Sequence, residues 1–171
     1  MITTVIFDMD GVLVNSEPLH HEVCLVQFEQ LNIEVTNELF ATFTGNSNKM
    51  IYQKIKNRFQ LDHEIEDLIA AKNKLFIEAF DKKEDFHLMS GVKDLIVDLY
   101  NNGMQLVVAS SSEMAIINKV FERFDLDQYF THKVSGNDFP ESKPNPAIFL
   151  KAAELAQTPV ENCIIIEDST N

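Results

Sequence analysis

Four short apolar segments constrain the fold of this chain more than any other feature. Each is only a few residues long, and three are rich in Val and Ile without an alternating polar position. A continuous apolar run is typical of a strand that is buried on both faces, as in a parallel sheet. We therefore predict strands at residues 3–8, 105–111, 132–136 and 162–168.

Amphipathic helical patterns separate these strands. One helix is expected at 91–103, with Gly103 as its stop signal. A second is expected at 113–124, after a serine-rich segment that is typical of an N-terminal cap. A third is expected at 146–156, with Pro146 in its first turn. The alternation of strands and helices predicts an α/β fold with a doubly wound parallel sheet.

The segment 16–87 interrupts this alternation, because it contains no convincing strand. A crossover between parallel strands needs only one helix. Four helices are expected here instead, at residues 18–31, 37–43, 49–59 and 63–82. We predict a helical cap domain at 16–87, inserted into an α/β core domain that comprises 1–15 and 88–171. Large insertions that follow a strand are commonly lids over a site.

The charge balance restricts the class of ligand. The chain has 14 Lys plus Arg against 27 Asp plus Glu, which gives a formal net charge of −13. We expect no nucleic-acid partner, because phosphate backbones are bound by clustered basic side chains. A small anionic ligand is compatible with this charge, since it needs only a local site and a metal ion.

The sequence contains no signal for export or for membrane insertion. The first segment, MITTVIFDMDG, reaches acidic residues at once, and no apolar run approaches the roughly 18 residues of a membrane span. Cys24 and Cys163 are isolated, so both are expected to be buried thiols in a reducing compartment. We expect a cytoplasmic protein with no membrane association and no obligate protein partner.

Polar residues follow the predicted strands at the points where these strands end. They are Asp8 and Asp10, then Ser110 and Ser111, then Glu167 and Asp168. Parallel strands end at one edge of a sheet, where open α/β folds bind their ligands. Crowded carboxylates repel one another, and a bound Mg²⁺ relieves this repulsion while it also takes a phosphate oxygen. The pattern predicts Mg²⁺ and phosphate at this edge, with Lys143 as a counter-charge.

Asp8 is the better candidate nucleophile, because it follows the strand directly and a carboxylate can form an acyl phosphate. Asp10 is expected to project to the same side of an extended chain, where it can protonate the leaving oxygen and then activate water. Taken singly, acidic pairs and serines after a strand also occur in ordinary turns and helix caps, and a single lysine in a loop is also an ordinary surface residue. Their common position at strand ends favours a site.

The polar segments form four motifs, which read DMDGVLVNSEPLHH (8–21), VVASSS (107–112), KPNPAIF (143–149) and IIIEDST (164–170). With these motifs the sequence resembles the haloacid dehalogenase-like superfamily of phosphohydrolases. The branch that it resembles contains β-phosphoglucomutases and sugar phosphatases with a helical cap. The resemblance extends over the whole chain and is weaker in the cap.

The resemblance implies a Mg²⁺-dependent phosphatase that acts on a small phosphorylated metabolite, with a sugar phosphate as the expected substrate, through a phosphoaspartate. Asp8 would be the nucleophile and Asp10 the general acid and base. The metal would be held by Asp8, the Asp10 backbone carbonyl, Glu167 and Asp168. The phosphoryl group would be bound by Ser110, Ser111 and Lys143. Substrate specificity would come from His20, Thr44, Gly45, Asn46, Ser47 and Asn48.

Three departures from the family pattern bear on the activity. Asn15 stands where many members have Asp. Asn48 stands where β-phosphoglucomutases have an Arg for a second phosphate, which favours a phosphatase and leaves the mutase as the alternative. Members also continue beyond the fourth motif with a helix and a strand, whereas this sequence ends at Asn171. A non-catalytic phosphate-binding protein or an inactive fragment is the third interpretation.

Overall fold

The computed structural model describes residues 1–43 and 47–169, which fall into two compact units. One comprises Met1–Ser16 and Asp85–Asn171, and we call it the α/β unit. The other comprises Glu17–Glu84, and we call it the helical unit. The insertion predicted from the sequence, 16–87, is one residue longer at its start and three residues longer at its end.

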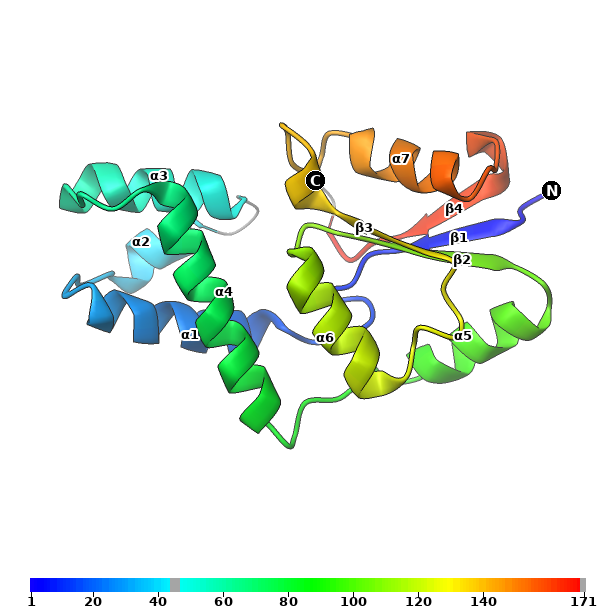
Figure 1. Cartoon of the computed structure of the whole chain (residues 1–171), viewed down its shortest axis with the longest axis horizontal. Helices are drawn as coiled ribbons and strands as arrows, with labels where there is room; N and C mark the ends of the chain where they lie inside the picture. Colours follow the sequence, from blue (N-terminus) through cyan, green and yellow to red (C-terminus); the bar gives the residue numbers. More distant parts are fainter. Residues whose placement is uncertain (44–46, 170–171) are drawn as a thin grey trace. The chain divides into compact units, whose positions relative to one another are not determined.

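The α/β unit is built on a four-stranded parallel sheet in the order β3-β2-β1-β4 (Figure 1). The strands are β1 (Thr4–Phe7), β2 (Gln105–Ser110), β3 (His132–Ser135) and β4 (Cys163–Ile166). The register aligns Phe7 with Val108 and with Ile166, and Ser110 with Ser135. The predicted parallel sheet is confirmed, and the polar residues that follow the strands share one edge.

Helices cover both faces of this sheet, as a doubly wound fold requires (Figure 1). α7 (Ala147–Leu155) lies on one face, and α5 (Val92–Asn101) and α6 (Met114–Phe124) lie on the other. A short 3₁₀ helix, η1 (Gly136–Asp138), follows β3, and another, η2 (Val160–Asn162), precedes β4. Burial of the continuous apolar strands between these layers stabilises the fold by about 1.5–3 kcal/mol for each large aliphatic side chain.

β4 is the edge strand that is least covered. Ile164 and Ile165 point to opposite faces of the sheet, and they are 49% and 44% exposed. The central strands contrast with it, since Val107, Val108 and Ala109 of β2 are fully buried.

The helical unit contains α1 (Glu17–Gln30), α2 (Asn37–Ala41), α3 (Asn48–Phe59) and α4 (Ile65–Lys82). Thr36 and Ser47 cap α2 and α3, because their side-chain oxygens accept hydrogen bonds from the backbone N–H groups of Leu39 and Met50. The unit has its own core, formed by Phe28, Phe43, Tyr52, Ile55 and Leu68. No strand occurs among the described residues of this unit, in agreement with the pattern of its sequence.

The two ends of the insertion are tied together within the α/β unit. Val14 and Leu88 form an isolated antiparallel bridge, and the Met89 N–H donates to the Leu13 carbonyl at 2.9 Å. We call this pairing the neck. The chain therefore leaves the α/β unit for the helical unit and returns to it at adjacent points.

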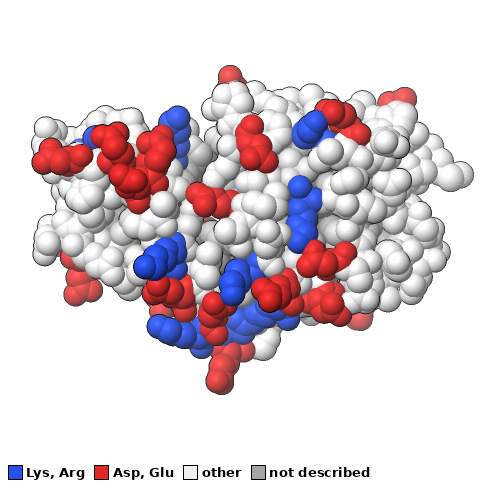
Figure 2. Space-filling view, viewed as in Figure 1, with Lys and Arg blue, Asp and Glu red and all other residues white. Residues whose placement is uncertain are grey.

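The sequence predicted that both cysteines are buried thiols. Cys24 and Cys163 are half-buried, not fully buried, because each lies at the margin of a core cluster. No helix in the described part of the chain has the length and apolarity needed to cross a bilayer. Acidic side chains lie on the surfaces of both units, as the net charge of −13 requires (Figure 2).

Candidate functional site

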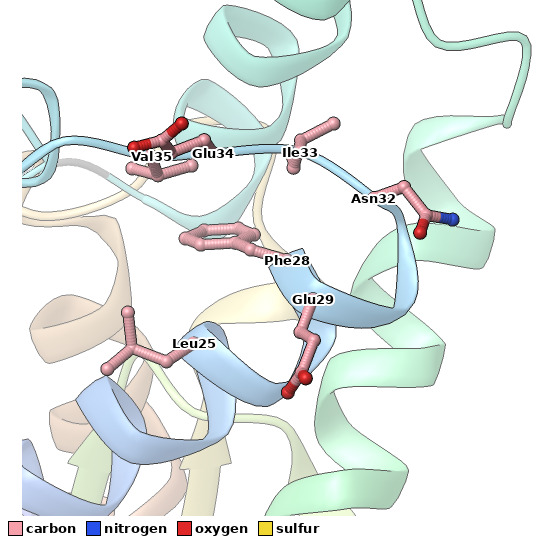
Figure 3. A pocket seen from close by; sticks show the side chains of 7 residues that line it. All are labelled: Leu25, Phe28, Glu29, Asn32, Ile33, Glu34 and Val35. Carbon is pink, nitrogen blue, oxygen red and sulfur yellow. The ribbon is translucent and has the colours of Figure 1, made fainter.

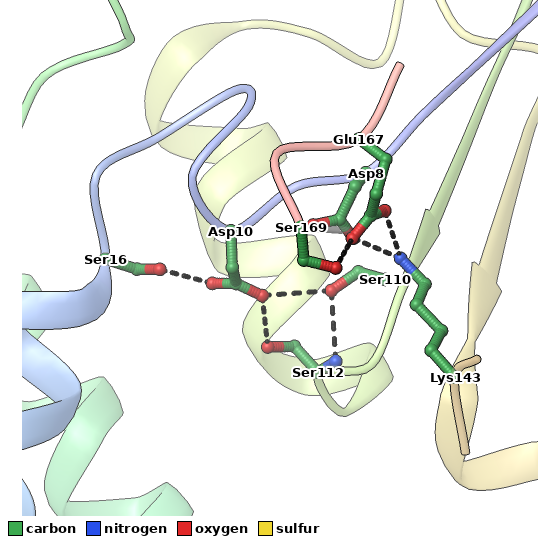
Figure 4. A network of polar contacts seen from close by, with 8 residues as sticks. All are labelled: Asp8, Asp10, Ser16, Ser110, Ser112, Lys143, Glu167 and Ser169. Atoms are coloured by element: carbon green, nitrogen blue, oxygen red, sulfur yellow. Dashed lines mark hydrogen bonds and ion pairs between the residues drawn. The ribbon is translucent and has the colours of Figure 1, made fainter. Parts of the chain in front are cut away.

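The candidate site lies where the strands of the α/β unit end. Asp8 follows β1, Ser110 is the last residue of β2, and Glu167 and Asp168 follow β4. Lys143 reaches the same place from the loop that precedes α7 (Figure 4). Residues from four separate segments therefore meet at one edge of the sheet, which is the common ligand position in this fold class.

Asp8 and Lys143 form the centre of the site. The Lys143 Nζ donates to Asp8 Oδ1 at 2.7 Å and to Glu167 Oε2 at 2.9 Å. The side chains of Asp8 and Lys143 are only 8% and 14% exposed, so this pair is shielded from water and from screening by salt.

Burial raises the pKa of Asp8 to about 7, from an ordinary value of 3.8. Lys143 opposes this rise by its charge and its hydrogen bond, while the charges of Glu167 and Asp10 add to it. One lysine does not neutralise three neighbouring acids. The site therefore has a local excess of negative charge that a bound cation would offset.

Three carboxylates are close enough to share a metal ion. Oxygen atoms of Asp8, Glu167 and Asp168 lie within 4.8 Å of one another, and carboxylate oxygens are the ligands that Mg²⁺ prefers. Gly11 gives Asp168 its space, because a Cβ atom at Gly11 would lie 2.1 Å from Asp168 Oδ2. The residues present thus fit a divalent cation.

The Asp10 side chain is directed toward the hydroxyl groups of three serines (Figure 4). Ser110 and Ser112 donate to its Oδ2 at 3.1 and 2.8 Å, and Ser16 donates to its Oδ1. The backbone is not extended from Asp8 to Asp10, although the sequence-based prediction placed both side chains on one side of an extended chain. β1 ends at Phe7, and backbone hydrogen bonds to the Met9 carbonyl fold residues 9–14 into a tight turn.

The serine-rich segment does not cap α6, contrary to the sequence-based expectation. Glu113 occupies the N-cap position and makes no side-chain capping hydrogen bond. The hydroxyls of Ser110 and Ser112 are used at Asp10 instead. Ser111, also predicted to bind phosphate, lies between them with an exposed side chain. Hydroxyl groups at a strand end serve either to cap the following helix or to bind a neighbouring carboxylate. The sequence pattern alone does not distinguish these two uses.

Ser16 and Ser112 were not among the site residues predicted from the sequence. Both hydroxyls are buried, with exposed fractions of 1% and 8%, and both contact the same carboxylate. The available signal was their position in the sequence. Ser112 lies two residues after a predicted site residue, and Ser16 lies within the first motif.

The predicted specificity residues lie in the helical unit. His20 is in α1, Ser47 is the N-cap of α3, and Asn48 is its first residue. Thr44, Gly45 and Asn46 lie outside the described residues.

His20 has a partner that the sequence did not indicate as functional. Its ring stacks on Phe76 at 4.3 Å between centroids, and its Nδ1 lies 3.0 Å from the Nζ of the buried Lys72. In the sequence, Lys72 stands out because it is a lysine within the apolar stripe of α4.

A separate hollow lies on the helical unit (Figure 3). It has a volume of about 500 Å³ and is lined by Leu25, Phe28, Glu29 and residues 32–35. Its described lining contains none of the residues predicted for the site. The hollow is open and shallow, and it is formed by the margin of the aromatic core of this unit.

Comparison with known proteins places the chain in a family. Residues 5–171 match the haloacid dehalogenase-like hydrolase family. Hexitol phosphatase B of Escherichia coli K12 is 30% identical over 176 residues, which cover 99% of this chain and 77% of that protein. Protein SUPPRESSOR OF QUENCHING 1, chloroplastic, of Arabidopsis thaliana is also 30% identical, but the matched region is only 16% of its length.

The fold agrees with a solved structure. CbbY from Rhodobacter sphaeroides, in complex with phosphate, superposes with a TM-score of 0.89 at 26% identity. The match covers 99% of this chain and 79% of that one, and this chain is the shorter at its C-terminus.

Proposed function

The chain belongs to the haloacid dehalogenase-like hydrolase family, and we propose that it hydrolyses the phosphate monoester of a small metabolite, with a sugar phosphate as the substrate class. The observation that carries this proposal is the buried Asp8 carboxylate, held at 2.7 Å by Lys143 at the end of β1. A nucleophile that is fixed by a cation, with further acids beside it, suits phosphoryl transfer better than it suits a purely structural ion pair.

Asp8 is proposed to attack phosphorus, so that the bond between phosphorus and the substrate oxygen breaks as an acyl phosphate forms. Asp10 gives a proton to the departing oxygen. In the second step Asp10 takes a proton from water, which attacks the acyl phosphate, releases inorganic phosphate and restores Asp8. Ser110, 3.1 Å from Asp10, would bind the phosphoryl group next to this acid.

Mg²⁺ is the proposed cofactor, with Asp8, the Asp10 backbone carbonyl, Glu167 and Asp168 as its ligands. When bound it would neutralise charge on the transferring group together with the ammonium group of Lys143. The proximity of the Asp8, Glu167 and Asp168 oxygens supports three of these ligands.

The helical unit is proposed to contribute to substrate choice through His20, Ser47 and Asn48. Replacement of Asn48 by Ala should change the ranking of sugar phosphates more than the rate on an unselective aryl phosphate. An equal loss on every substrate would remove Asn48 from the specificity set. We further propose that the protein acts in the cytoplasm on a soluble metabolite.

The test is phosphate release by the purified chain from a panel of hexitol, hexose and small organic-acid phosphates, with Mg²⁺ and with EDTA. Release that requires Mg²⁺ and disappears in Asp8→Asn is the expected result. Interconversion of glucose phosphates without phosphate release would favour the alternative activity, a β-phosphoglucomutase. Tight binding of Mg²⁺ and phosphate without turnover would identify a non-catalytic protein.

A further inference from the structure

A chain of buried serines connects β3 to Asp10. The Ser112 hydroxyl donates to Asp10 Oδ2 at 2.8 Å, and Ser112 is 8% exposed. The backbone carbonyl of Ser112 accepts a hydrogen bond of 2.8 Å from the hydroxyl of Ser135, which is 1% exposed. Ser135 is the last residue of β3, 23 positions further along the sequence.

The turn after β2 is thus held from two directions. Within the turn, the Ser112 N–H donates to the Ser110 Oγ at 3.0 Å. From β3, Ser135 binds the Ser112 carbonyl, and Gly136 lets the two segments approach closely, since an added Cβ would lie 3.0 Å from the Ser111 Cα. The position of the Ser112 hydroxyl is therefore set by hydrogen bonds and close packing on either side of it.

Asp10 needs such support, because it lies in a turn and not in a strand. Its carboxylate is repelled by the neighbouring acids of the site. A hydroxyl donates one proton at a time, so Ser110 cannot donate to Asp10 while it donates to a bound phosphoryl group. Ser112 then becomes the donor that continues to hold Oδ2.

We propose that Ser112 and Ser135 are positioning residues: Ser135 fixes the turn at Ser112, and Ser112 holds the Asp10 carboxylate beside Ser110. This inference rests on the proposed phosphatase function, in which Asp10 transfers protons at the substrate oxygen. Neither serine touches the reacting atoms. Loss of either should therefore disturb the orientation of Asp10 and the rate of chemistry, and it should leave substrate binding largely intact.

Steady-state kinetics separate positioning from binding. Ser112→Val should lower kcat by about tenfold with KM within about twofold, because one buried hydrogen bond to a charged group is lost. Ser112→Thr has the same shape and retains the hydroxyl, so it should recover most of kcat. Ser135→Ala should reproduce the loss of kcat, and it should add less in a Ser112→Val background than it does alone. The exposed Ser90→Ala is the control.

A second measurement decides the point without catalysis. The side-chain carboxyl ¹³C resonance of Asp10, assigned by Asp10→Asn, should shift in Ser112→Val and in Ser135→Ala but not in Ser90→Ala or Ser112→Thr. An inactive wild type would overturn the proposed function and leave this comparison decisive. An unmoved resonance, or equal kcat values for Ser112→Val and Ser112→Thr in an active enzyme, would overturn the positioning role.

Discussion

Two buried polar networks, one in each unit of this protein, differ in their charge. In the helical unit the Tyr52 hydroxyl donates to Gln27 Oε1, and Gln27 Nε2 donates to the Leu68 carbonyl at 2.7 Å. These groups are neutral, and they satisfy one another. In the α/β unit the buried group is a carboxylate, Asp8, with one lysine and several acids around it.

The difference separates a structural network from a functional one. Burial raises the pKa of Tyr52, which keeps its hydroxyl protonated as a hydrogen-bond donor and so supports the fold. Burial also raises the pKa of Asp8, which works against the ionised form that a nucleophile requires. A neutral network is complete by itself, whereas an uncompensated charge cluster implies a ligand that is bound during function.

The largest expected effect tests the charged network. Asp8→Asn keeps the shape of the side chain but removes the nucleophile, so phosphate release should fall at least about a thousandfold, which corresponds to roughly 4 kcal/mol of barrier. The measurement is Mg²⁺-dependent release from the best substrate of the panel. Activity above a thousandth of wild type would remove Asp8 from the nucleophile's role.

The pH dependence of stability should distinguish the units next. The pKa of Asp8 is higher in the folded state than in the unfolded chain, so its contribution is complete below about pH 4 and is lost as the pH rises through about 7. Without metal, the free energy of unfolding should fall by a few kcal/mol between pH 4 and 8 relative to that of Asp8→Asn.

Urea denaturation at pH 4 and at pH 8, with EDTA, measures this difference directly. Saturating Mg²⁺ should reduce the loss at pH 8, because a bound cation favours the carboxylate. If wild type and Asp8→Asn follow parallel pH profiles, the charge on Asp8 is not a source of instability.

Gly11→Ala probes the space beside the charged cluster. The substitution introduces a side chain at a φ of +84° and 2.1 Å from Asp168 Oδ2, so Asp168 must move. We expect Mg²⁺ affinity to fall by about tenfold, or about 1.4 kcal/mol, as measured by isothermal titration.

Gly103→Ala is the matched control for this change. Its φ is +76°, and a Cβ atom there has open space around it, so it carries the same backbone strain of about 1–2 kcal/mol without the contact. Equal Mg²⁺ affinity in the two variants would show that Gly11 serves only the turn.

The smallest effect on activity is expected for the neutral network. Tyr52→Phe leaves Gln27 Oε1 without its donor and should lower the free energy of unfolding by about 1–3 kcal/mol. Turnover of an aryl phosphate should be unchanged. A loss of turnover comparable to that of the site variants would mean that the two networks are not functionally separate.

The secondary structure was predictable because both kinds of element have strong patterns here. Short apolar segments located all four strands to within two residues at either end, and amphipathic stripes located the seven α-helices of the described residues to within about two. The common edge of the sheet followed from parallel strands alone, and with it the meeting of Asp8 and Glu167.

Side-chain direction was the part that the sequence did not reveal. Asp8 and Asp10 are two residues apart, yet they bind different partners, because a turn begins where an extended chain was expected after the predicted strand. The use of the Ser112 hydroxyl depends on Ser135, which is distant in sequence. Contacts of this kind depend on tertiary packing, on which local periodicity carries no information.

The neck formed by Val14 and Leu88 gives the chain an evolutionary freedom. Because the α/β unit itself joins the two ends of the insertion, descendants can lengthen, shorten or exchange the helical unit without changing the register of the sheet. Under the proposed function, selection on the substrate and selection on the chemistry act on separate stretches of the gene: one continuous block for the insert, and two flanking blocks that retain the acids and the lysine.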